Sequence, residues 1–339
     1  MAGIKRCTHC ILSENFPSIE FDEDGVCNFC RDKLLFSTEK RKVEEAREEI
    51  IRMFDNARGR SEYDAIVCYS GGKDSTLTLK LTVEKYNLRV LAFTLENHFT
   101  SPGALENIKK VVANLGVDHI VFTPSKKFMV NLYRASSIYD IYNKRTLTRI
   151  SSNCNSCISL INNTALKYAL EKKIPFIISG FTLGQIPVNA IYYQNIYSFL
   201  KDSRKPVIEK LKKYAGPEAA NYMEINGNLL NRVKSYPYNV NILCLENFTE
   251  EEIVRSILPL GWAPPKDVDG CSSNCRLNVF NNYVHEKKLG YNPYELELSH
   301  LIRNNLLTRE EALEKINDQP QEQIRLIMSE LEICDNDIS

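Results

Sequence analysis

The sequence predicts an α/β protein built on a doubly wound parallel sheet, preceded by a zinc-binding knuckle and followed by a helical region. Three observations lead to this fold class. Short apolar runs alternate with helical patterns between residues 61 and 250, which is typical of a parallel sheet covered on both faces. A glycine-containing turn, Ser70–Ser75, follows the first apolar run, and two Cys-x-x-Cys pairs stand before it.

The first expected unit spans residues 1–36 and contains Cys7, Cys10, Cys27 and Cys30. Two Cys-x-x-Cys pairs at this separation are typical of tetrahedral zinc, because each tight turn presents two thiolates to one ion. Four sulfurs leave no open position for a substrate, so the expected role of Zn2+ is to fold the segment. Free thiols, or iron in a rubredoxin-like site, are the alternatives.

The rest of the chain divides into a connecting helix at 37–60, a nucleotide-binding domain at 61–250 and a helical C-terminal region at 251–339. The domain is expected to carry a mostly helical insertion at about 187–238. The expected strands are Ala65–Tyr69, Arg89–Leu95, His119–Thr123, Pro175–Ser179 and Val240–Leu245. We expect Cys68 and Cys244 to lie in the core and Trp262 to serve packing.

Charge and hydropathy exclude some classes of protein. The 339 residues contain 43 Lys plus Arg and 43 Asp plus Glu, so no overall field attracts a long nucleic acid. No apolar run is long enough to cross a bilayer, and the start lacks the apolar segment of a secretory signal. We therefore expect a cytoplasmic protein without membrane contact, whose cysteines remain thiols or bind metal.

The Ser70–Ser75 turn has the composition of an anion-binding loop. Gly71 and Gly72 allow backbone amides to turn inward at the start of a helix, where the helix dipole also favours an anion. Hydroxyl donors and one cation surround these amides: Ser70, Lys73, Ser75 and Thr76. The turn lacks the spacing of a Walker A loop or a dinucleotide fingerprint, and we expect it to bind pyrophosphate.

This SGGKDS turn resembles the signature of the PP-loop, or N-type ATP pyrophosphatase, superfamily. The resemblance implies that ATP is split between its α and β phosphates, that an adenylate activates a substrate oxygen, and that nitrogen or sulfur then replaces this oxygen. It implies catalytic roles for Lys73, Asp74 and Ser75, with Asp74 near Mg2+. It also places the adenine near Phe93 and Thr94 on the second strand and near Gly180 after the fourth strand.

A second cysteine group consists of Cys154-x-x-Cys157 and Cys271-x-x-x-Cys275 in polar, turn-like surroundings. A doubly wound sheet can bring both segments over the edge where ATP binds. The layout resembles PP-loop tRNA thiolases, which hold a [4Fe-4S] cluster on a CxxC pair and one distant cysteine. This resemblance makes sulfur transfer the first expectation, with a sulfur donor as partner. A second zinc site or free thiols remain the alternatives.

The layout is also similar to the N-acetyl sugar amidotransferases. The shared order is FDEDGVCNFC, SGGKDST, LGVDHI, the CxxC pair, GYNP and LTREEALEKI. This second resemblance implies an N-acetyl or nucleotide sugar as acceptor and ammonia from a separate glutaminase subunit. A non-catalytic nucleotide-binding module is a third reading. The expected acceptor is a small molecule or RNA. A homodimer is expected only because it is the commonest oligomeric state.

Overall fold

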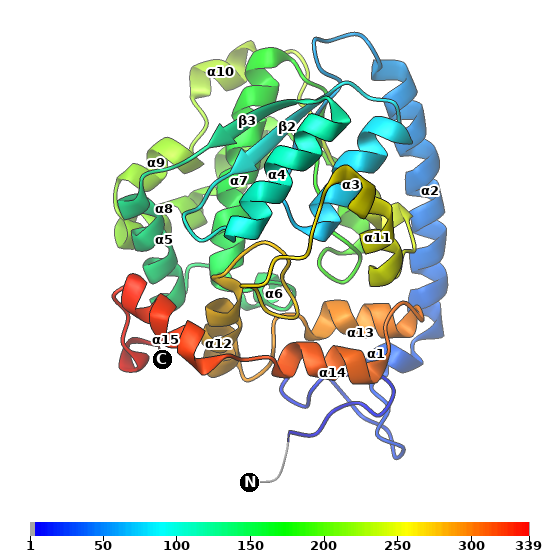
Figure 1. The fold of residues 1–339 in the computed structure, drawn as a ribbon, viewed down its shortest axis with the longest axis vertical. Helices are drawn as coiled ribbons and strands as arrows, with labels where there is room; N and C mark the ends of the chain where they lie inside the picture. Colours follow the sequence, from blue (N-terminus) through cyan, green and yellow to red (C-terminus); the bar gives the residue numbers. More distant parts are fainter. Residues whose placement is uncertain (1–3, 339) are drawn as a thin grey trace.

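A six-stranded, mostly parallel sheet forms the centre of the molecule (Figure 1), as the sequence predicts. The structure, a computed structural model, describes residues 4–338, apart from the side chains of Leu35, Lys201 and Ser203. Residues 1–3 and 339 of the expected end segments lie outside this range. The strands are β1 (Ala65–Cys68), β2 (Val90–Leu95), β3 (Asp118–Phe122), β4 (Phe176–Ile178), β5 (Tyr192–Gln194) and β6 (Tyr238–Val240).

The strand order is β3-β2-β1-β4-β6-β5, with only β5 antiparallel to its neighbour among the described strands. The chain moves outward from β1 through β2 to β3, and it then crosses to β4 on the other side of β1. Connections that leave β1 in opposite directions open a crevice at the carboxyl ends of the strands. The fold therefore places a binding crevice between the ends of β1 and β4.

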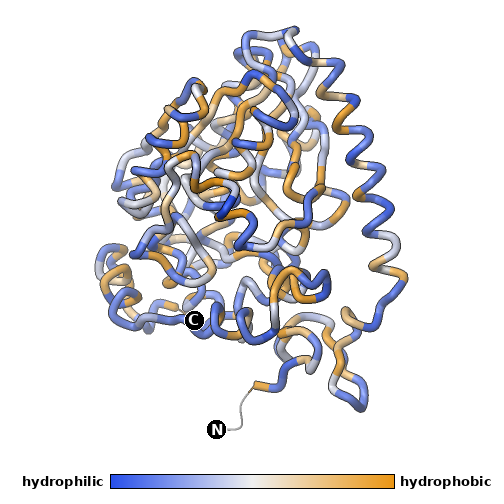
Figure 2. Tube along the Cα trace, turned by 45° about the vertical axis from the view of Figure 1, so that its right-hand side comes forward, coloured by the Kyte–Doolittle hydropathy of each residue, from blue (hydrophilic) through white to orange (hydrophobic). Residues whose placement is uncertain are grey.

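Helices cover both faces of the sheet because alternate residues of each strand point to opposite sides. Ala65 and Val67 of β1 belong to the core formed with α2 (Lys33–Ala57), α3 (Lys73–Glu84), α4 (Pro102–Leu115) and α11 (Glu250–Ile257). Ile66 instead packs with α7 (Ser152–Lys172) on the other face. In Figure 2, hydrophobic residues recur along the otherwise hydrophilic α2, whose buried positions include Ala46, Ile50 and Phe54.

Several of the remaining helices pack on one another beside the sheet. α5 (Lys126–Ile138) packs against α7 and α8, and α12 packs against α7 and α15. The bounds are α1 (Asn28–Arg31), α6 (Lys144–Leu147), α8 (Lys205–Ala215), α9 (Glu218–Met223), α10 (Gly227–Arg232), α12 (Asn278–Leu289), α13 (Glu295–Arg303), α14 (Arg309–Asn317) and α15 (Gln321–Glu330). No helix within residues 4–338 is both long enough and apolar enough to traverse a bilayer.

Two details differ from the sequence-based expectations. The expected strand Val240–Leu245 is wrong beyond its first residue, because β6 ends at Val240 and Ile242–Leu245 form a 3-10 helix. All four residues of that helix are buried, which explains why the apolar run resembles a strand. The insertion at 187–238 contains helices but also β5, an edge strand that its tyrosine-rich sequence forms against β6.

The N-terminal knuckle packs against the C-terminal helices α13 and α14 in one apolar cluster. A fully buried carboxylate connects them: Glu295 accepts hydrogen bonds from Arg6 Nη1 at 2.8 Å and from the Ser13 amide at 2.9 Å. It also accepts from the Asn292 amide at 3.2 Å. A buried carboxylate needs such partners, so Glu295 fixes the orientation of α13 relative to the knuckle.

Replacement of Glu295 by alanine removes the ion-pair partner of Arg6 and the hydrogen-bond acceptor of two buried amides. We expect Glu295→Ala to lower the free energy of unfolding by about 3 kcal/mol, measured by urea denaturation. Glu332→Ala is the control, because Glu332 pairs with Arg134 on the surface, where an ion pair contributes little. Equal stability of the two variants would contradict a linking role for Glu295.

Candidate functional site

The turn between β1 and α3 is held in a conformation that requires glycine. Gly71 has a φ of +79°, and a Cβ atom there would lie 2.5 Å from the carbonyl oxygen of Ala104 on α4. The indole Nε1 of the buried Trp262 donates a hydrogen bond of 2.9 Å to the Gly71 carbonyl oxygen. Trp262, which was expected only to pack, therefore also fixes the orientation of the Gly71 carbonyl group. The backbone amides of the turn point away from this contact.

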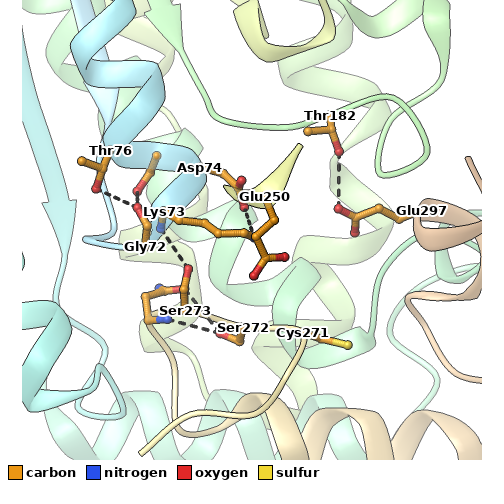
Figure 3. Close-up of polar contacts among 12 residues, drawn as sticks. Gly72, Lys73, Asp74, Thr76, Thr182, Glu250, Cys271, Ser272, Ser273 and Glu297 are labelled. Carbon is orange, nitrogen blue, oxygen red and sulfur yellow. Dashed lines mark hydrogen bonds and ion pairs between the residues drawn. The ribbon is translucent and has the colours of Figure 1, made fainter. Parts of the chain in front are cut away.

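Hydroxyl groups close the turn onto the first turn of α3 (Figure 3). Ser75 Oγ lies 3.0 Å from Ser70 Oγ and donates to the Gly72 carbonyl oxygen at 3.1 Å. Thr76 Oγ1 donates to the same oxygen at 2.8 Å. Ser70 and Ser75 line a cavity of about 280 Å³, whereas Thr76 is fully buried. Thr76, predicted to bind the nucleotide, braces the loop in this structure.

Lys73 and Asp74 form an ion pair at the start of α3, with 3.1 Å between Lys73 Nζ and an Asp74 oxygen. Both residues line the 280 Å³ cavity. Burial alone would lower the pKa of Lys73, but the carboxylates of Asp74, Glu250 and Glu297 raise it above its usual value. Lys73 thus stays positively charged in the cavity, where it can pair with a phosphate group.

The cavity lies at the crevice between the ends of β1 and β4. Its lining includes Asn97 after β2 and Gly180 after β4. A Cβ atom on Gly180 would lie 2.9 Å from Thr78 Oγ1 and 3.2 Å from the Ser75 backbone, so glycine is needed for this approach. A larger neighbouring cavity of about 640 Å³ shares several of its lining residues and adds Arg145 and Arg149.

Of the three residues predicted to contact adenine, one lines the cavity and two are buried in the protein interior. Gly180 lines the cavity, as expected, but Phe93 and Thr94 line neither cavity. Phe93 packs against Tyr168 with 5.5 Å between ring centroids, and Thr94 Oγ1 donates to the Tyr69 carbonyl oxygen at 2.7 Å. Both side chains are buried in this structure, so a contact of adenine with Phe93 and Thr94 stays a prediction.

Three cysteines of the second group meet beside the PP-loop-like turn. Cys154 and Cys157 lie in the first turns of α7, and Cys275 comes from the loop before α12. Asn97 Nδ2 lies 3.7 Å from Cys157 Sγ and 3.9 Å from Cys275 Sγ. Asn281 Nδ2 donates to Cys154 Sγ at 3.2 Å. All three thiols line the 280 Å³ cavity, so the predicted convergence is found.

Burial determines the protonation of these thiols when no metal is bound. It raises the pKa of Cys154 to about 11 and of Cys275 to about 12, and it also raises the pKa of Cys157. The amide donors Asn97 and Asn281 oppose this shift because a thiolate accepts hydrogen bonds more strongly than a thiol. A cation among the three sulfurs would shift the balance to thiolate.

Cys271 lines the same cavity but has different partners. Its sulfur lies 3.5 Å from the Lys315 carbonyl oxygen. Within residues 4–338, only the knuckle cysteines bring three or more metal-ligating atoms within 4.8 Å of one another. The four residues Cys154, Cys157, Cys271 and Cys275 therefore do not form a tetrahedral zinc arrangement. Cys68, expected in the core, lines the cavity, whereas Cys244 is buried as expected.

The knuckle cysteines Cys7, Cys10, Cys27 and Cys30 form the expected compact group. Cys10 Sγ and Cys27 Sγ are 3.7 Å apart, and the amides of Cys10 and Cys27 donate to Cys7 Sγ at 3.4 and 3.2 Å. Four sulfurs at this spacing, with amide donors that favour thiolate, fit one tetrahedral metal ion. The four cysteines line neither cavity, but they belong to an apolar cluster with α13 and α14 that also includes the cavity residues Cys271 and Tyr294.

The loop that carries Cys271 and Cys275 covers the phosphate-binding turn. Ser273 Oγ accepts a hydrogen bond of 2.9 Å from the Lys73 amide, and a Cβ atom on Gly72 would lie 3.0 Å from the same oxygen. Figure 3 shows this contact between the loop and the start of α3. The amide at the helix N-terminus, which a phosphate would use, is thus occupied by a serine hydroxyl.

One protein family is similar to the C-terminal part of the chain. Residues 268–338 match the family described as LPS biosynthesis protein WbpG-like, C-terminal domain. The chain is also similar to an uncharacterized protein of Methanocaldococcus jannaschii, with 23% identity over 314 residues and 92% of each protein covered. The matched family segment contains Cys271, Cys275 and helices α12 to α15.

Solved structures with some likeness come from three enzymes. The U34-tRNA thiolase NcsA from Methanococcus maripaludis, with its [4Fe-4S] cluster, has 15% identity and a TM-score of 0.33, covering 89% of this chain and 86% of that one. An NH3-dependent NAD synthetase from Campylobacter jejuni has 15% identity and a TM-score of 0.31, covering 55% and 76%. An NMN synthetase from Francisella tularensis has 14% identity and a TM-score of 0.35, covering 86% and 97%.

The parallel sheet, its switch point and the SGGKDS turn at the end of β1 together define an α/β fold like that of the PP-loop ATPases. The C-terminal segment over the same cavity resembles the WbpG-like domain, which agrees with the amidotransferase layout in the sequence.

Replacement of Ser273 by alanine frees the Lys73 amide for an incoming phosphate. We expect Ser273→Ala to bind inorganic pyrophosphate more tightly than the wild type, by roughly three- to tenfold, since one competing hydrogen bond is removed. Calorimetric titration with magnesium pyrophosphate measures this change. Ser272→Ala is the control, because Ser272 Oγ accepts from the amides of Asn274 and Cys275. Weaker pyrophosphate binding by Ser273→Ala would show that its hydroxyl is a ligand.

Proposed function

We propose that the protein is an ATP pyrophosphatase-type enzyme that adenylates an oxygen of an acceptor and then replaces that oxygen. One observation carries this proposal: the SGGKDS turn, with its Lys73–Asp74 pair, opens into a cavity at the switch point of the sheet. A glycine turn at a helix N-terminus suits the departing pyrophosphate, which carries several negative charges. The second cavity beside it provides space for an acceptor.

The residues of the turn have separate tasks in this reaction. Lys73 pairs with the phosphate oxygens, and Ser70 and Ser75 donate hydrogen bonds from their hydroxyl groups. Asp74 would hold Mg2+, which supplies positive charge to the phosphates when bound. The acceptor oxygen attacks the α-phosphorus, the bond from this phosphorus to the bridging oxygen breaks, and pyrophosphate leaves. Charge stabilisation at the leaving group is the main contribution of such a site.

We infer that nitrogen replaces the activated oxygen. The WbpG-like match supports this inference because the matched segment supplies the cavity residues Cys271, Cys275, Tyr294 and Glu297. The family description concerns lipopolysaccharide biosynthesis, which suits a sugar acceptor with an N-acetyl group. Its acetamido oxygen would be adenylated and replaced by ammonia, which a separate glutaminase would supply. We propose that this reaction takes place in the cytoplasm.

Sulfur transfer is the second candidate, and a different observation favours it. Cys154, Cys157 and Cys275 meet at the cavity while Cys271 does not join them. Three cysteine ligands fit a [4Fe-4S] cluster with one iron open, and a cluster tolerates wider sulfur spacing than a zinc ion does. The cysteine layout of the sequence favours sulfur, whereas the WbpG-like match supports nitrogen. The acceptor would then gain sulfur in place of oxygen.

The product distinguishes the two candidates. An N-acetylated nucleotide sugar is incubated with ATP, Mg2+ and either ammonium or sulfide. The mass of the acceptor after the reaction is then measured by mass spectrometry. Replacement of oxygen by an imino group gives a slightly lighter product, whereas replacement by sulfur gives a heavier one. Unchanged acceptor with both donors, with no pyrophosphate released, would oppose both reactions.

Loss of the lysine charge should stop adenylation without disturbing the knuckle. We expect Lys73→Ala to lower the rate of pyrophosphate release by at least about 100-fold, because the leaving pyrophosphate loses its cation. The bound metal of the knuckle should be unchanged. Lys80→Ala is the matched control, since Lys80 lies on the same helix and pairs with Glu84 at the surface. Full activity of Lys73→Ala would remove this residue from the mechanism.

Metal analysis tests the two cysteine groups separately. We expect the knuckle to hold one Zn2+ per chain and Cys10→Ser to lose it. If a cluster is present in protein purified without oxygen, Cys154→Ala, Cys157→Ala and Cys275→Ala should each lose iron and sulfide, whereas Cys271→Ala should retain them. Iron loss in Cys271→Ala alone would contradict the observed grouping. A second zinc would support a structural role for the group.

A further inference from the structure

A carboxylate that forms no ion pair with any described residue lines both cavities. Glu297, on α13, lines the 280 Å³ cavity together with Lys73 and Asp74, and it also lines the 640 Å³ cavity. In Figure 3 its carboxylate extends from α13 toward Thr182 and toward the side of the site that holds Lys73 and Asp74. Glu297 therefore lies where an activated acceptor and an incoming nucleophile would meet.

The position of this carboxylate is fixed by the loop after β4. Thr182 Oγ1 donates to Glu297 Oε1 at 3.4 Å, and the Gln185 side chain also forms a hydrogen bond with the carboxylate. Gly184 has a φ of +100°, and a Cβ atom there would lie 2.7 Å from the Glu297 Cα. The loop that follows the central strand β4 thus packs directly on α13 at this residue.

Among the described residues, no lysine, arginine or histidine lies within ion-pair distance of Glu297; Lys73 instead pairs with Asp74. The other titratable groups near Glu297 are Asp74, Cys271 and Tyr294. Arg145 and Arg149 line the larger cavity, where Arg149 donates to the Gly184 carbonyl oxygen. Glu297 is half-buried, and its carboxylate has a hydrogen bond but no ion pair among the described residues, so the site favours an added cation.

Burial raises the pKa of Glu297 to about 7, and the negative charge of Asp74 raises it further than Lys73 lowers it. A carboxyl group that titrates near neutral pH can both accept and release a proton under physiological conditions. This property suits a group that must take a proton from a nitrogen nucleophile and then return to its starting state.

We propose that Glu297 binds the ammonium ion that supplies nitrogen and accepts its proton, with Thr182 and Gln185 holding the carboxylate in place. This assignment rests on the proposed nitrogen transfer. It names the position of the nucleophile, which neither the family match nor the SGGKDS turn identifies. Ammonium suits the position because it is a small cation with hydrogen-bond donors and fits beside an unpaired carboxylate.

The proposed step balances in atoms and charge. Ammonium transfers one proton to the Glu297 carboxylate, and the resulting ammonia forms a C–N bond with the adenylated carbon. The bond from this carbon to the oxygen bearing the adenylate breaks, and AMP leaves with that oxygen. The amidinium product keeps the nitrogen. Glu297 then releases its proton to solvent through the open cavity, and no oxidant or reductant is needed.

The first experiment measures ammonium binding without any acceptor. Full-length protein with Mg2+ and α,β-methylene-ATP is titrated with ammonium chloride, and potassium chloride provides the ionic-strength control. We expect ammonium to raise the thermal unfolding midpoint of the wild type more than potassium does, because it binds the folded state. Glu297→Gln should lose this ammonium-specific shift. Glu250→Gln should keep it, since Glu250 lies near Lys73 but lines neither cavity.

An equal ammonium-specific shift in Glu297→Gln would overturn the proposal, and so would its absence in the wild type. The second experiment follows turnover with UDP-N-acetylglucosamine as the probe acceptor. We expect Glu297→Gln to release pyrophosphate within about threefold of the wild-type rate but to form amidine at least 100-fold more slowly. Hydroxylamine, which is largely unprotonated at neutral pH, should restore nitrogen transfer to this variant.

The two experiments separate the two proposals. Loss of pyrophosphate release in Glu297→Gln would place the carboxylate in the adenylation step and overturn its assignment to ammonium. A wild-type protein that shows the ammonium shift but makes no nitrogen product would oppose the proposed reaction with this acceptor while leaving the ammonium site supported.

Discussion

Three close backbone contacts, each of which requires glycine, are the constraint on which the site depends. Gly71 brings the turn against α4, Gly180 brings the loop after β4 against α3, and Gly184 brings the same loop against α13. A side chain at any of these positions would meet backbone or helix atoms at less than 3 Å. The cavity, the Lys73–Asp74 pair and the Glu297 carboxylate are held together by these contacts.

The knuckle also helps to position the cavity residues, although its four cysteines do not line the cavity. Glu295 and Glu297 lie on the first turn of α13, and their side chains contact different parts of the molecule. Glu295 is fully buried among donors from the knuckle, whereas Glu297 reaches the cavity. A metal that folds the knuckle would therefore also fix the start of α13, because the acceptor of the Arg6 and Ser13 bonds is part of this helix. Such a metal would have a positioning role without any contact with substrate.

Much of this architecture follows from the sequence. Alternating apolar runs predicted the parallel sheet, the spacing of Cys7 to Cys30 predicted the compact sulfur group, and SGGKDS predicted the turn. The sequence could not show that Ile242–Leu245 is a buried 3-10 helix, because burial produces the same apolar run as a strand. Nor could it identify Glu297. A lone glutamate in a helix usually faces solvent, and only the tertiary contacts of Gly184 and Thr182 bring this one into the cavity.

The charges around the cavity bear on the choice between nitrogen and sulfur. Asp74 and Glu297 both contribute negative charge, and only Asp74 has a lysine partner within ion-pair distance among residues 4–338. The Glu297 carboxylate itself attracts ammonium but repels free hydrosulfide, which is anionic. Sulfur would therefore have to arrive bound to a metal held by Cys154, Cys157 and Cys275, because coordination offsets that repulsion. A nitrogen donor needs no such carrier, since the carboxylate that deprotonates ammonium also attracts it.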